Sequence, residues 1–414
     1  MKNSKKLVAL LLSLSMVFAL AACGGGSTAS PSPSASQPAP TESAPAETTP
    51  AAADFSVAMI TDYGDITDQS FNQTTYEACK AYCDANGVPF NYYKPAGDNT
   101  ADRVAMVEKA IDEGYNVIVM PGYAFAGTIV ETQDEYPDAT FIGLDVSEYD
   151  IEDCFYNHDQ DGNRTDLIDA SNEPHIASNV YCAVYQEELC GYMAGYAAVK
   201  LGYTHLGFLG GMAVPAVVRY GYGFVQGADA AAAGTSADVT VEYVYGNQFF
   251  GDADITAYMD NWYQTLGVQA VFACGGGIYA SAAEAAAKVD GAKVIGVDVD
   301  QAGIIDGAYG AGMTVTSAMK GLAPTVQHML EEVAAGNFAN YGGKIETLGL
   351  VSGDDPTANY VQIPMETTQW GDGFTQDDYK ALVKAMFDGT VTVSNDITAM
   401  PAVTITVNEY GNIK

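Results

Sequence analysis

Positively charged residues are scarce in this sequence. It contains 17 lysines and arginines against 52 aspartates and glutamates, which gives a formal net charge of −35. A surface of that charge repels the phosphates of nucleic acids and of anionic lipids. We therefore exclude nucleic acids and anionic lipid surfaces as partners and expect a solvated protein outside the cell.

Histidine is also rare, and the usual signatures of hydrolytic enzymes are missing. The sequence has four histidines, and none of them lies beside cysteines at the spacing of a zinc site. They are His158, His175, His205 and His328. Neither a Gly-x-Ser-x-Gly segment nor a cysteine–histidine pair at nucleophile spacing occurs. We expect no metal, no cofactor and no catalytic residues.

The chain does not open with a segment of transmembrane length. Three lysines precede an apolar run from Leu7 to Ala22, which is too short to span a bilayer comfortably and predicts a secretory signal. The run ends in Leu20-Ala21-Ala22-Cys23, which resembles the bacterial lipobox. We expect residues 1–22 to be a lipoprotein signal peptide and Cys23 to be acylated; the alternative is an ordinary cleaved signal.

Residues 24–53 contain almost only Gly, Ser, Ala, Pro and Thr. Such a composition buries too little apolar surface to offset the entropy of ordering, so residues 23–53 are predicted to form a lipidated, disordered tether. The part from Asp54 onward is longer than one hydrophobic core usually serves, which predicts two lobes.

Six cysteines follow the proposed anchor: Cys79, Cys83, Cys154, Cys182, Cys190 and Cys274. An even number in an exported chain permits disulfides. We favour the alternative in which they are buried thiols that behave as small hydrophobic residues.

The apolar pattern predicts a doubly wound α/β fold. From Phe55, short apolar strands alternate with helical patterns, and the same alternation restarts after an irregular acidic stretch. We assign residues 54–178 to lobe 1, with a surface insertion at about 149–179, and residues 179–297 to lobe 2. We also expect the chain to return to lobe 1 at about 298–320 and to add a C-terminal segment, about 321–414, to lobe 2.

Polar, aromatic or glycine residues follow most of these strands. In doubly wound sheets the ligand site lies beyond the carboxyl ends of the strands, so these residues are candidates for ligand binding. They are Asp62, Phe71, Asn72, Gly122, Asp145, Phe249, Phe250, Gly276, Asp298 and Lys320. Carboxylates accept hydrogen bonds from hydroxyls, and aromatic faces stack on a heterocycle. A single aspartate in such a place is equally explained as a helix cap.

Several of these segments resemble the basic membrane protein family of substrate-binding lipoproteins, the purine nucleoside receptor A-like group. The matching segments run in the family's order from residue 54 to about 340: Asp62 with Asp68-Gln69-Ser70-Phe71-Asn72-Gln73, then Glu187 to Gly195, Phe208-Leu209-Gly210-Gly211, Val297-Asp298-Val299-Asp300-Gln301 and Ser317-Ala318-Met319-Lys320. Gln69 stands where the family usually has lysine, and the 149–179 insertion has no counterpart that aligns.

The resemblance implies a type I periplasmic-binding-protein fold in which a nucleoside is enclosed between the lobes. Phe71 would then stack on the base, with Asn72 and Asp62 at its edge, and Asp145 would contribute from the same lobe. Asp298 would accept from the ribose hydroxyls, and Lys320 would donate to the sugar. For the aromatic residue opposite Phe71, the family pattern leaves two candidates, of which we favour Phe250 over Phe249.

The expected function is that of a receptor for an ABC importer. The protein would be a monomer, lipid-anchored on the outer face of the cytoplasmic membrane, and would deliver a purine nucleoside to permease subunits. The alternatives are a sugar or other small polar metabolite as ligand, or a sensor of the same ligand. A nucleoside hydrolase is disfavoured because the carboxylates are spread one to a strand end over both lobes.

Overall fold

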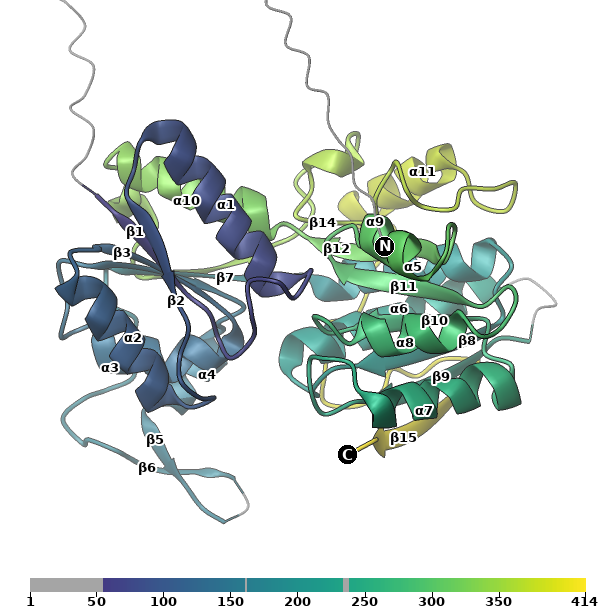
Figure 1. The fold of residues 1–414 in the computed structure, drawn as a ribbon, viewed down its shortest axis with the longest axis horizontal. Coiled ribbons are helices and arrows are strands. Elements are labelled where there is room, and N and C mark those ends of the chain that lie inside the picture. The colour runs from purple at the N-terminus through teal and green to yellow at the C-terminus, as the bar shows by residue number, and fades with distance from the viewer. Residues whose placement is uncertain (1–54, 161, 234–237) are drawn as a thin grey trace, which may run out of the picture. The chain divides into compact units, whose positions relative to one another are not determined.

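Two α/β lobes make up the part of the protein that the structure, a computed structural model, describes: residues 55–160, 162–233 and 238–414 (Figure 1). The predicted signal peptide, Cys23 and the tether lie outside the described residues. Within these ranges no helix combines the length and the apolar character needed to cross a membrane.

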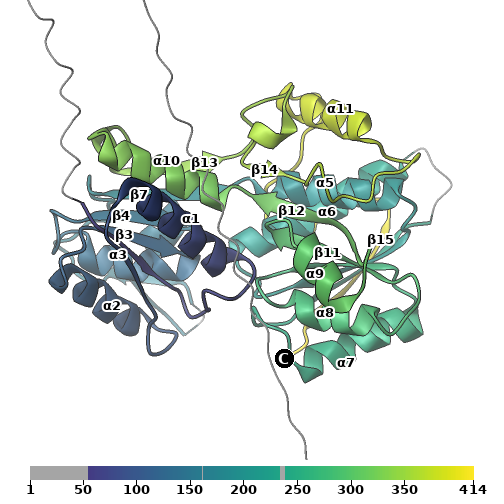
Figure 2. The same ribbon diagram turned by 45° about the horizontal axis from the view of Figure 1, so that its top comes forward.

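The first lobe is built on a six-stranded parallel sheet. In sheet order its strands are β13 (Lys344–Leu348), β7 (Val180–Tyr185), β4 (Thr140–Leu144), β3 (Val117–Pro121), β1 (Val57–Ile60) and β2 (Phe90–Tyr93). One face carries α1 (Phe71–Asn86) and α10 (Leu322–Ala334), which lie side by side in Figures 1 and 2. The other carries α2 (Thr100–Asp112), η1 (Tyr123–Phe125) and α3 (Ala126–Thr132).

Burial on both faces explains why these strands are uniformly apolar. Val57 and Met59 of β1 pack in the cluster that includes α1, whereas the alternate residues Ala58 and Ile60 pack in the cluster that includes α2. Successive side chains of a strand point to opposite faces, so a sheet covered on both sides needs an unbroken apolar run.

The second lobe repeats the arrangement on a seven-stranded sheet that is parallel except for β14. Its strands in order are β14 (Val361–Gln362), β12 (Thr314–Lys320), β11 (Lys293–Asp298), β10 (Ala270–Cys274), β8 (His205–Gly210), β9 (Thr240–Tyr245) and β15 (Thr406–Asn412). The helices are α5 (Glu187–Lys200), α6 (Pro215–Ala232), α7 (Ala253–Asn261) with its π-helical extension η2 (Trp262–Leu266), α8 (Tyr279–Ala286) and α9 (Ala302–Tyr309).

The C-terminal segment covers this second lobe. After η3 (Phe338–Asn340) and η4 (Pro356–Ala358), the chain forms α11 (Gln376–Phe387) and ends with β15 at the sheet edge. The hydroxyl of Tyr379 on α11 lies 3.8 Å from the sulfur of Met193 on α5, so α11 packs onto the α5 side of the lobe (Figure 2).

The lobe boundaries differ from those expected from the sequence. β7 belongs to the first sheet, so lobe 1 extends beyond residue 178 to Tyr185. β12, at 314–320, belongs to the second sheet, and the return to lobe 1 consists of α10 and β13 instead. Of the C-terminal segment expected in lobe 2, about 321–414, only the part from β14 onward adds to that lobe. Strands of both lobes have the same apolar pattern, and their sheet membership is fixed by pairing with distant segments.

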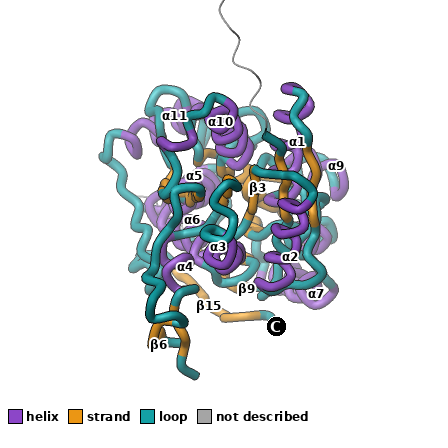
Figure 3. Tube along the Cα trace, turned by 90° about the vertical axis from the view of Figure 1, so that its left-hand side faces the viewer, coloured by secondary structure: helices purple, strands orange, loops and turns teal. Residues whose placement is uncertain are grey.

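The expected surface insertion contains regular structure. It begins with α4 (Glu148–Asp153), whose Ser147 and Asp150 form a capping box, and continues with the hairpin of β5 (Tyr156–His158) and β6 (Arg164–Leu167). Figures 1 and 3 show the hairpin projecting from the rest of the first lobe. Very short strands and a helix of fewer than two turns leave little periodicity in a sequence.

Candidate binding cavity

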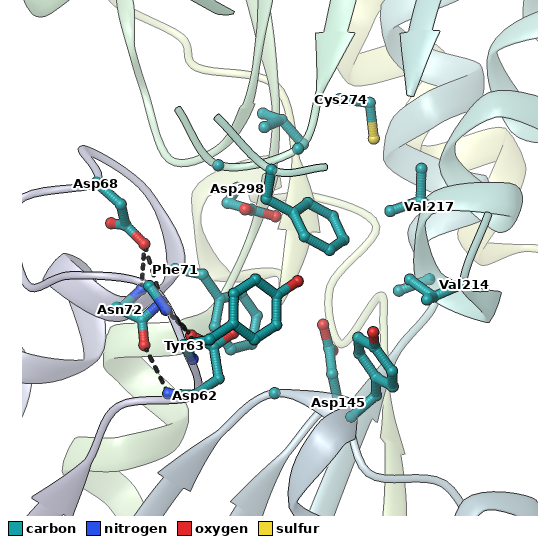
Figure 4. A pocket seen from close by; sticks show the side chains of 18 of the residues that line it. Asp62, Tyr63, Asp68, Phe71, Asn72, Asp145, Val214, Val217, Cys274 and Asp298 are labelled. Carbon is teal, nitrogen blue, oxygen red and sulfur yellow. Dashed lines mark hydrogen bonds between the residues drawn. The ribbon is translucent and has the colours of Figure 1, made fainter. Parts of the chain in front are cut away.

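A cavity of about 400 Å³ lies where the loops after the strands of the two sheets meet. All ten residues predicted to bind ligand line it. Figure 4 labels Asp62, Phe71, Asn72, Asp145 and Asp298 among them. The carboxyl ends of parallel strands converge at one edge of each sheet, so residues more than 200 positions apart are brought together by topology alone. Whether each residue can play its predicted role depends on which of its polar atoms are not already hydrogen-bonded within the protein.

Strained backbone marks the same region. Within the described ranges, four non-glycine residues have positive φ: Gln69 at 57°, Asp145 at 59°, Asn247 at 58° and Asp298 at 64°. Asp145 and Asp298 lie directly after β4 and at the end of β11, and both line the cavity. Left-handed conformations cost an ordinary residue roughly 1–2 kcal/mol. Strain of this kind gathers at functional sites, where it aims side chains that a relaxed backbone would turn away.

Asp62, at the end of β1, is held by three protein donors. Its Oδ1 accepts from the backbone N–H groups of Tyr63 and Gly64, each at 2.6 Å, and from Nδ2 of Asn72 at 3.1 Å. Burial raises the pKa of Asp62, and these hydrogen bonds offset part of that rise. The carboxylate is thereby fixed in orientation before any ligand arrives.

Asn72 supports Asp62 and Asp68. Its Nδ2 donates to Asp62 and also to Oδ2 of Asp68 at 3.1 Å, while its Oδ1 accepts from the backbone N–H of Asp62 at 3.3 Å. Both amide hydrogens are therefore used within the protein. Asp68 in turn accepts from the backbone N–H groups of Ser70, Asn72 and Gln73 and so satisfies donors at the start of α1.

Three aromatic rings surround the centre of the cavity. Phe71, at the start of α1, lies beneath the ammonium of Lys320, which is 4.6 Å from the ring centroid. Tyr63 and Phe249 come from different lobes, and their ring centroids are 6.2 Å apart. Phe250, in contrast, is 58% exposed. Because Phe250 also lines the cavity but is largely exposed, we now propose Phe249 as the opposing aromatic residue in place of the preferred Phe250.

Two glycines, Gly211 and Gly275, explain why the Phe249 ring and not the Phe250 ring lies inside the cavity. The sequence pattern does not show that they are neighbours of Phe249. A Cβ on Gly211 would lie 2.4 Å from Cδ1 of Phe249, and one on Gly275 would lie 3.0 Å from it. The absence of side chains there makes room for the Phe249 ring beside the β8 and β10 strand ends.

The opposite end of the cavity is charged. Lys320, at the end of β12, forms an ion pair with Asp145 and lies 3.6 Å from both Asp298 and Glu187. Nε of Arg219, on α6, donates to Oε2 of Glu187 at 2.7 Å. We call these five residues the charged cluster. Burial alone lowers the pKa of Lys320, but its three carboxylate neighbours raise it above its usual range, so the lysine stays protonated.

Two carboxylate oxygens of the charged cluster are buried without a hydrogen-bond partner: Oδ1 of Asp145 and Oε1 of Glu187. Of these two residues, Asp145 lines the cavity. Asp298, by comparison, accepts from Oγ of Ser70 at 2.6 Å and from the Tyr220 hydroxyl at 3.3 Å. A buried acceptor without a donor is costly, so the carboxylate of Asp145 is less completely satisfied within the protein than that of Asp298.

Close contact between α5 and α6 places Glu187 and Arg219 side by side. A Cβ on Gly191 would lie 2.2 Å from the carbonyl oxygen of Tyr220, and one on Gly223 would lie 2.1 Å from that of Glu188. Glycines on both helices therefore let the two backbones come into contact. This contact is the physical reason for the glycines in the Glu187-to-Gly195 segment noted in the sequence.

Sequence reasoning missed several lining residues. Tyr63, Tyr123 and Arg219 line the cavity, and both tyrosine hydroxyls point at the sulfur of Met212, at 3.6 and 4.0 Å. Tyr63 and Tyr123 directly follow predicted lining residues, which is a usable signal. Arg219 lies within a helix, and no pattern distinguishes it from an exposed arginine.

Cysteines and metal-ligating groups add no further chemistry in the described part of the chain. The six cysteines are free thiols, and all but Cys154 are buried. Across residues 55–160, 162–233 and 238–414, no group of three His, Cys, Asp or Glu side chains is placed to hold a metal ion.

Two parallel α/β lobes with a cavity at their strand ends are the fold of periplasmic-type solute-binding proteins. The structure of an ABC transporter solute-binding protein from Conexibacter woesei has this fold, with a TM-score of 0.59 at 20% identity, covering 82% of this chain and 99% of that chain. A likeness at this identity concerns the fold.

The family is shown by sequence. The family described as ABC transporter substrate-binding protein PnrA-like (Bmp) matches residues 55–354, and the chain belongs to it. It is thus a substrate-binding protein of an ABC transporter and not an enzyme. The ABC transporter nucleoside-binding protein BmpA of Lactococcus lactis is 24% identical, covering 72% of this chain and 80% of its own length. The CD4+ T-cell-stimulating antigen of Listeria innocua is 28% identical, covering 81% and 86%.

Proposed function

We propose that the protein binds a purine nucleoside in this cavity and delivers it to the permease subunits of an ABC importer. One observation supports this proposal most directly: aromatic rings line the cavity between two carboxylates that can accept hydrogen bonds from a ligand. Phe71 and Phe249 supply flat apolar faces for a heterocycle. Asp62 lies at one end and Asp145 at the other (Figure 4).

The spacing of these acceptors suits a nucleoside. Asp62 follows β1 and Asp145 follows β4, and β3 lies between these strands. Neighbouring strands are about 4.8 Å apart, so the two carboxylates are separated by roughly 10 Å along the sheet edge. A base held at Asp62 would then bring the hydroxyls of its sugar to Asp145 and Lys320. The name of the Lactococcus relative agrees with a nucleoside as ligand.

A panel of ligands tests the proposal. A ligand that binds only the native state raises the melting temperature, by an amount that grows with its concentration over Kd. Inosine, guanosine or adenosine is expected to raise it, whereas free ribose, glucose and amino acids are not. If a sugar raised it and no nucleoside did, the cavity would be a sugar site and the aromatic rings would serve as a stacking platform for the sugar.

We also propose that Cys23 anchors the protein through lipid on the outer face of the cytoplasmic membrane. The basic start, the apolar run and the small residues before Cys23 support this. A diacylated cysteine would supply the two chains that stable anchoring requires. Cys23→Ser is expected to abolish labelling by a radioactive fatty acid and to release the protein from membranes; unchanged membrane association would contradict the proposal.

A further inference from the structure

We propose that a latch outside the cavity holds the two lobes together and slows the release of a bound ligand. The interlobe latch consists of Gln69 and Ser70 in the first lobe and of Asp298 and Gln301 in the second. Its effect on ligand release rests on the proposed function, whereas its effect on the lobes can be measured without any ligand.

Two hydrogen bonds of the interlobe latch cross from one lobe to the other. Gln69 and Ser70 directly precede α1 of the first lobe, whereas Asp298 ends β11 and Gln301 precedes α9 in the second. Nε2 of Gln301 donates to the carbonyl oxygen of Gln69 at 3.1 Å. Oγ of Ser70 donates to Oδ2 of Asp298 at 2.6 Å, and a bond to a carboxylate is stronger than one between neutral groups.

Most of the interlobe latch is out of reach of a ligand. Asp298 lines the cavity, but Gln69, Ser70 and Gln301 do not. Ser70 and Gln301 are 0% and 1% exposed, so both bonds are shielded from water while the lobes are together. A ligand in the cavity therefore leaves the bond between Gln301 and Gln69 untouched. This bond adds to the contact between the lobes independently of the ligand.

Gln301 is held by its own lobe in the orientation that the latch needs. Its Oε1 accepts from the backbone N–H of Val297 at 2.9 Å, and its own backbone N–H donates to Oγ of Ser317 at 3.2 Å. Because Oε1 is occupied by a donor, the amide nitrogen is the end that faces Gln69. A Cβ on Gly296 would lie 2.9 Å from Cβ of Gln301, so the glycine makes room for this side chain.

Gln69 presents its carbonyl oxygen from a strained backbone. Its φ of 57° lies in the left-handed region, which residues other than glycine rarely adopt. Its backbone N–H donates to Oε1 of Gln73 at 3.1 Å, which ties this peptide to α1. Strained conformations persist only where surrounding contacts support them, and the bond from Gln301 is one such contact.

The lobes can separate without breaking either sheet. Three chain crossings join them: between β7 and α5, between β12 and α10, and between β13 and β14. Lobes joined in this way open and close by bending at the crossings. The latch bonds form only while the lobes are together, so they favour the closed arrangement. A ligand held between the lobes leaves after these bonds break.

Gln301→Glu tests the interlobe latch because the new side chain has nearly the same shape. The carboxylate keeps one oxygen for the N–H of Val297, but its second oxygen replaces the donor and faces the carbonyl of Gln69. Ser70→Ala removes the donor of the other bond and places a smaller side chain at a buried position, so it gives an independent variant if Gln301→Glu does not fold.

Gln133→Glu is the matched control because Gln133 makes the same kinds of bond within the first lobe alone. It is also 1% exposed. Its Oε1 accepts from the backbone N–H of Ala177 at 2.8 Å, and its Nε2 donates to the carbonyl of His175 at 3.3 Å. Each Gln→Glu substitution removes one buried donor, so chemical denaturation is expected to show similar losses of stability in both variants.

Small-angle X-ray scattering of the ligand-free chains measures the separation of the lobes, with Cys23→Ser in every chain to keep it in solution. The radius of gyration is expected to be larger in Gln301→Glu and in Ser70→Ala than in the wild type and in Gln133→Glu. Stopped-flow displacement of bound inosine measures release. Release is expected to be about tenfold faster in Gln301→Glu, the scale of one hydrogen bond, and unchanged in Gln133→Glu.

An unchanged radius of gyration in both latch variants would overturn the inference, and so would equal rates of inosine release from Gln301→Glu and Gln133→Glu. If the wild type binds no nucleoside, the proposed function fails, and the scattering comparison still decides whether the latch holds the lobes together.

Discussion

The two ends of the cavity differ in how completely the protein satisfies its own polar groups. At the Asp62 end, both amide hydrogens of Asn72 and one oxygen of Asp62 are committed to partners within the protein. In the charged cluster, three carboxylates surround two cations, and one oxygen of Asp145 and one of Glu187 lack a hydrogen-bond donor. Protein donors therefore fix the carboxylate at the first end, whereas the second end retains buried acceptors without a donor.

The largest effect is expected from removing the cation at the centre of the charged cluster. Lys320→Met leaves three buried carboxylates with only Arg219 nearby, and breaking a buried ion pair from one side costs about 3–5 kcal/mol. Chemical denaturation of the ligand-free protein measures the loss, and nucleoside binding is expected to disappear with it.

The pH dependence of that loss follows from the carboxylates. Burial raises the pKa of Asp145 to about 6, although Lys320 lowers it, so without the lysine this pKa rises further and the folded state takes up a proton more readily than the unfolded state. The stability difference from the wild type is therefore expected to shrink as the pH falls toward 5 and to be largest at neutral pH. A deficit independent of pH would indicate that lost packing, and not uncompensated charge, causes the effect.

An intermediate effect is expected at the aromatic rings, where two adjacent residues form a matched pair. Phe249→Ala removes a ring that faces Tyr63 inside the cavity, and the expected loss of nucleoside affinity is about 10- to 100-fold, on the scale of base–aromatic stacking. Phe250→Ala changes an exposed ring and is expected to stay within about threefold. Calorimetric titration of both variants decides; a larger loss in Phe250→Ala would restore the original preference.

The smallest effect is expected at Asn247, which has the same left-handed backbone as Asp145 and Asp298 but does not line the cavity. Asn247→Ala is expected to lower stability by about 1 kcal/mol, because alanine tolerates positive φ poorly. Asn247→Gly is expected to remain within about 0.5 kcal/mol of the wild type. Neither should change ligand affinity. If Asn247→Gly weakened binding, the strain at this loop would be part of the site.

Much of the site was predictable because the rules that place it are local. A buried apolar run predicts a parallel strand, and the residue after each such strand lies at the ligand edge of the sheet. Asp62, Asp145, Asp298 and Lys320 were found in this way. Phe249 was not preferred, because the choice between two neighbouring phenylalanines depends on the space left by Gly211 and Gly275, which lie far from them in the sequence.

The sequence by itself determined the two wound lobes, the family and the residues at the strand ends, because apolar periodicity and motif order are properties of the chain. Tertiary structure decided which lobe each late segment joins, since pairing partners of β7, β12 and β13 are distant. It also decided which polar atoms remain free. Hydrogen bonds between side chains distant in the sequence make Asn72 a support for Asp62 and Asp68, and they leave Oδ1 of Asp145 without a donor.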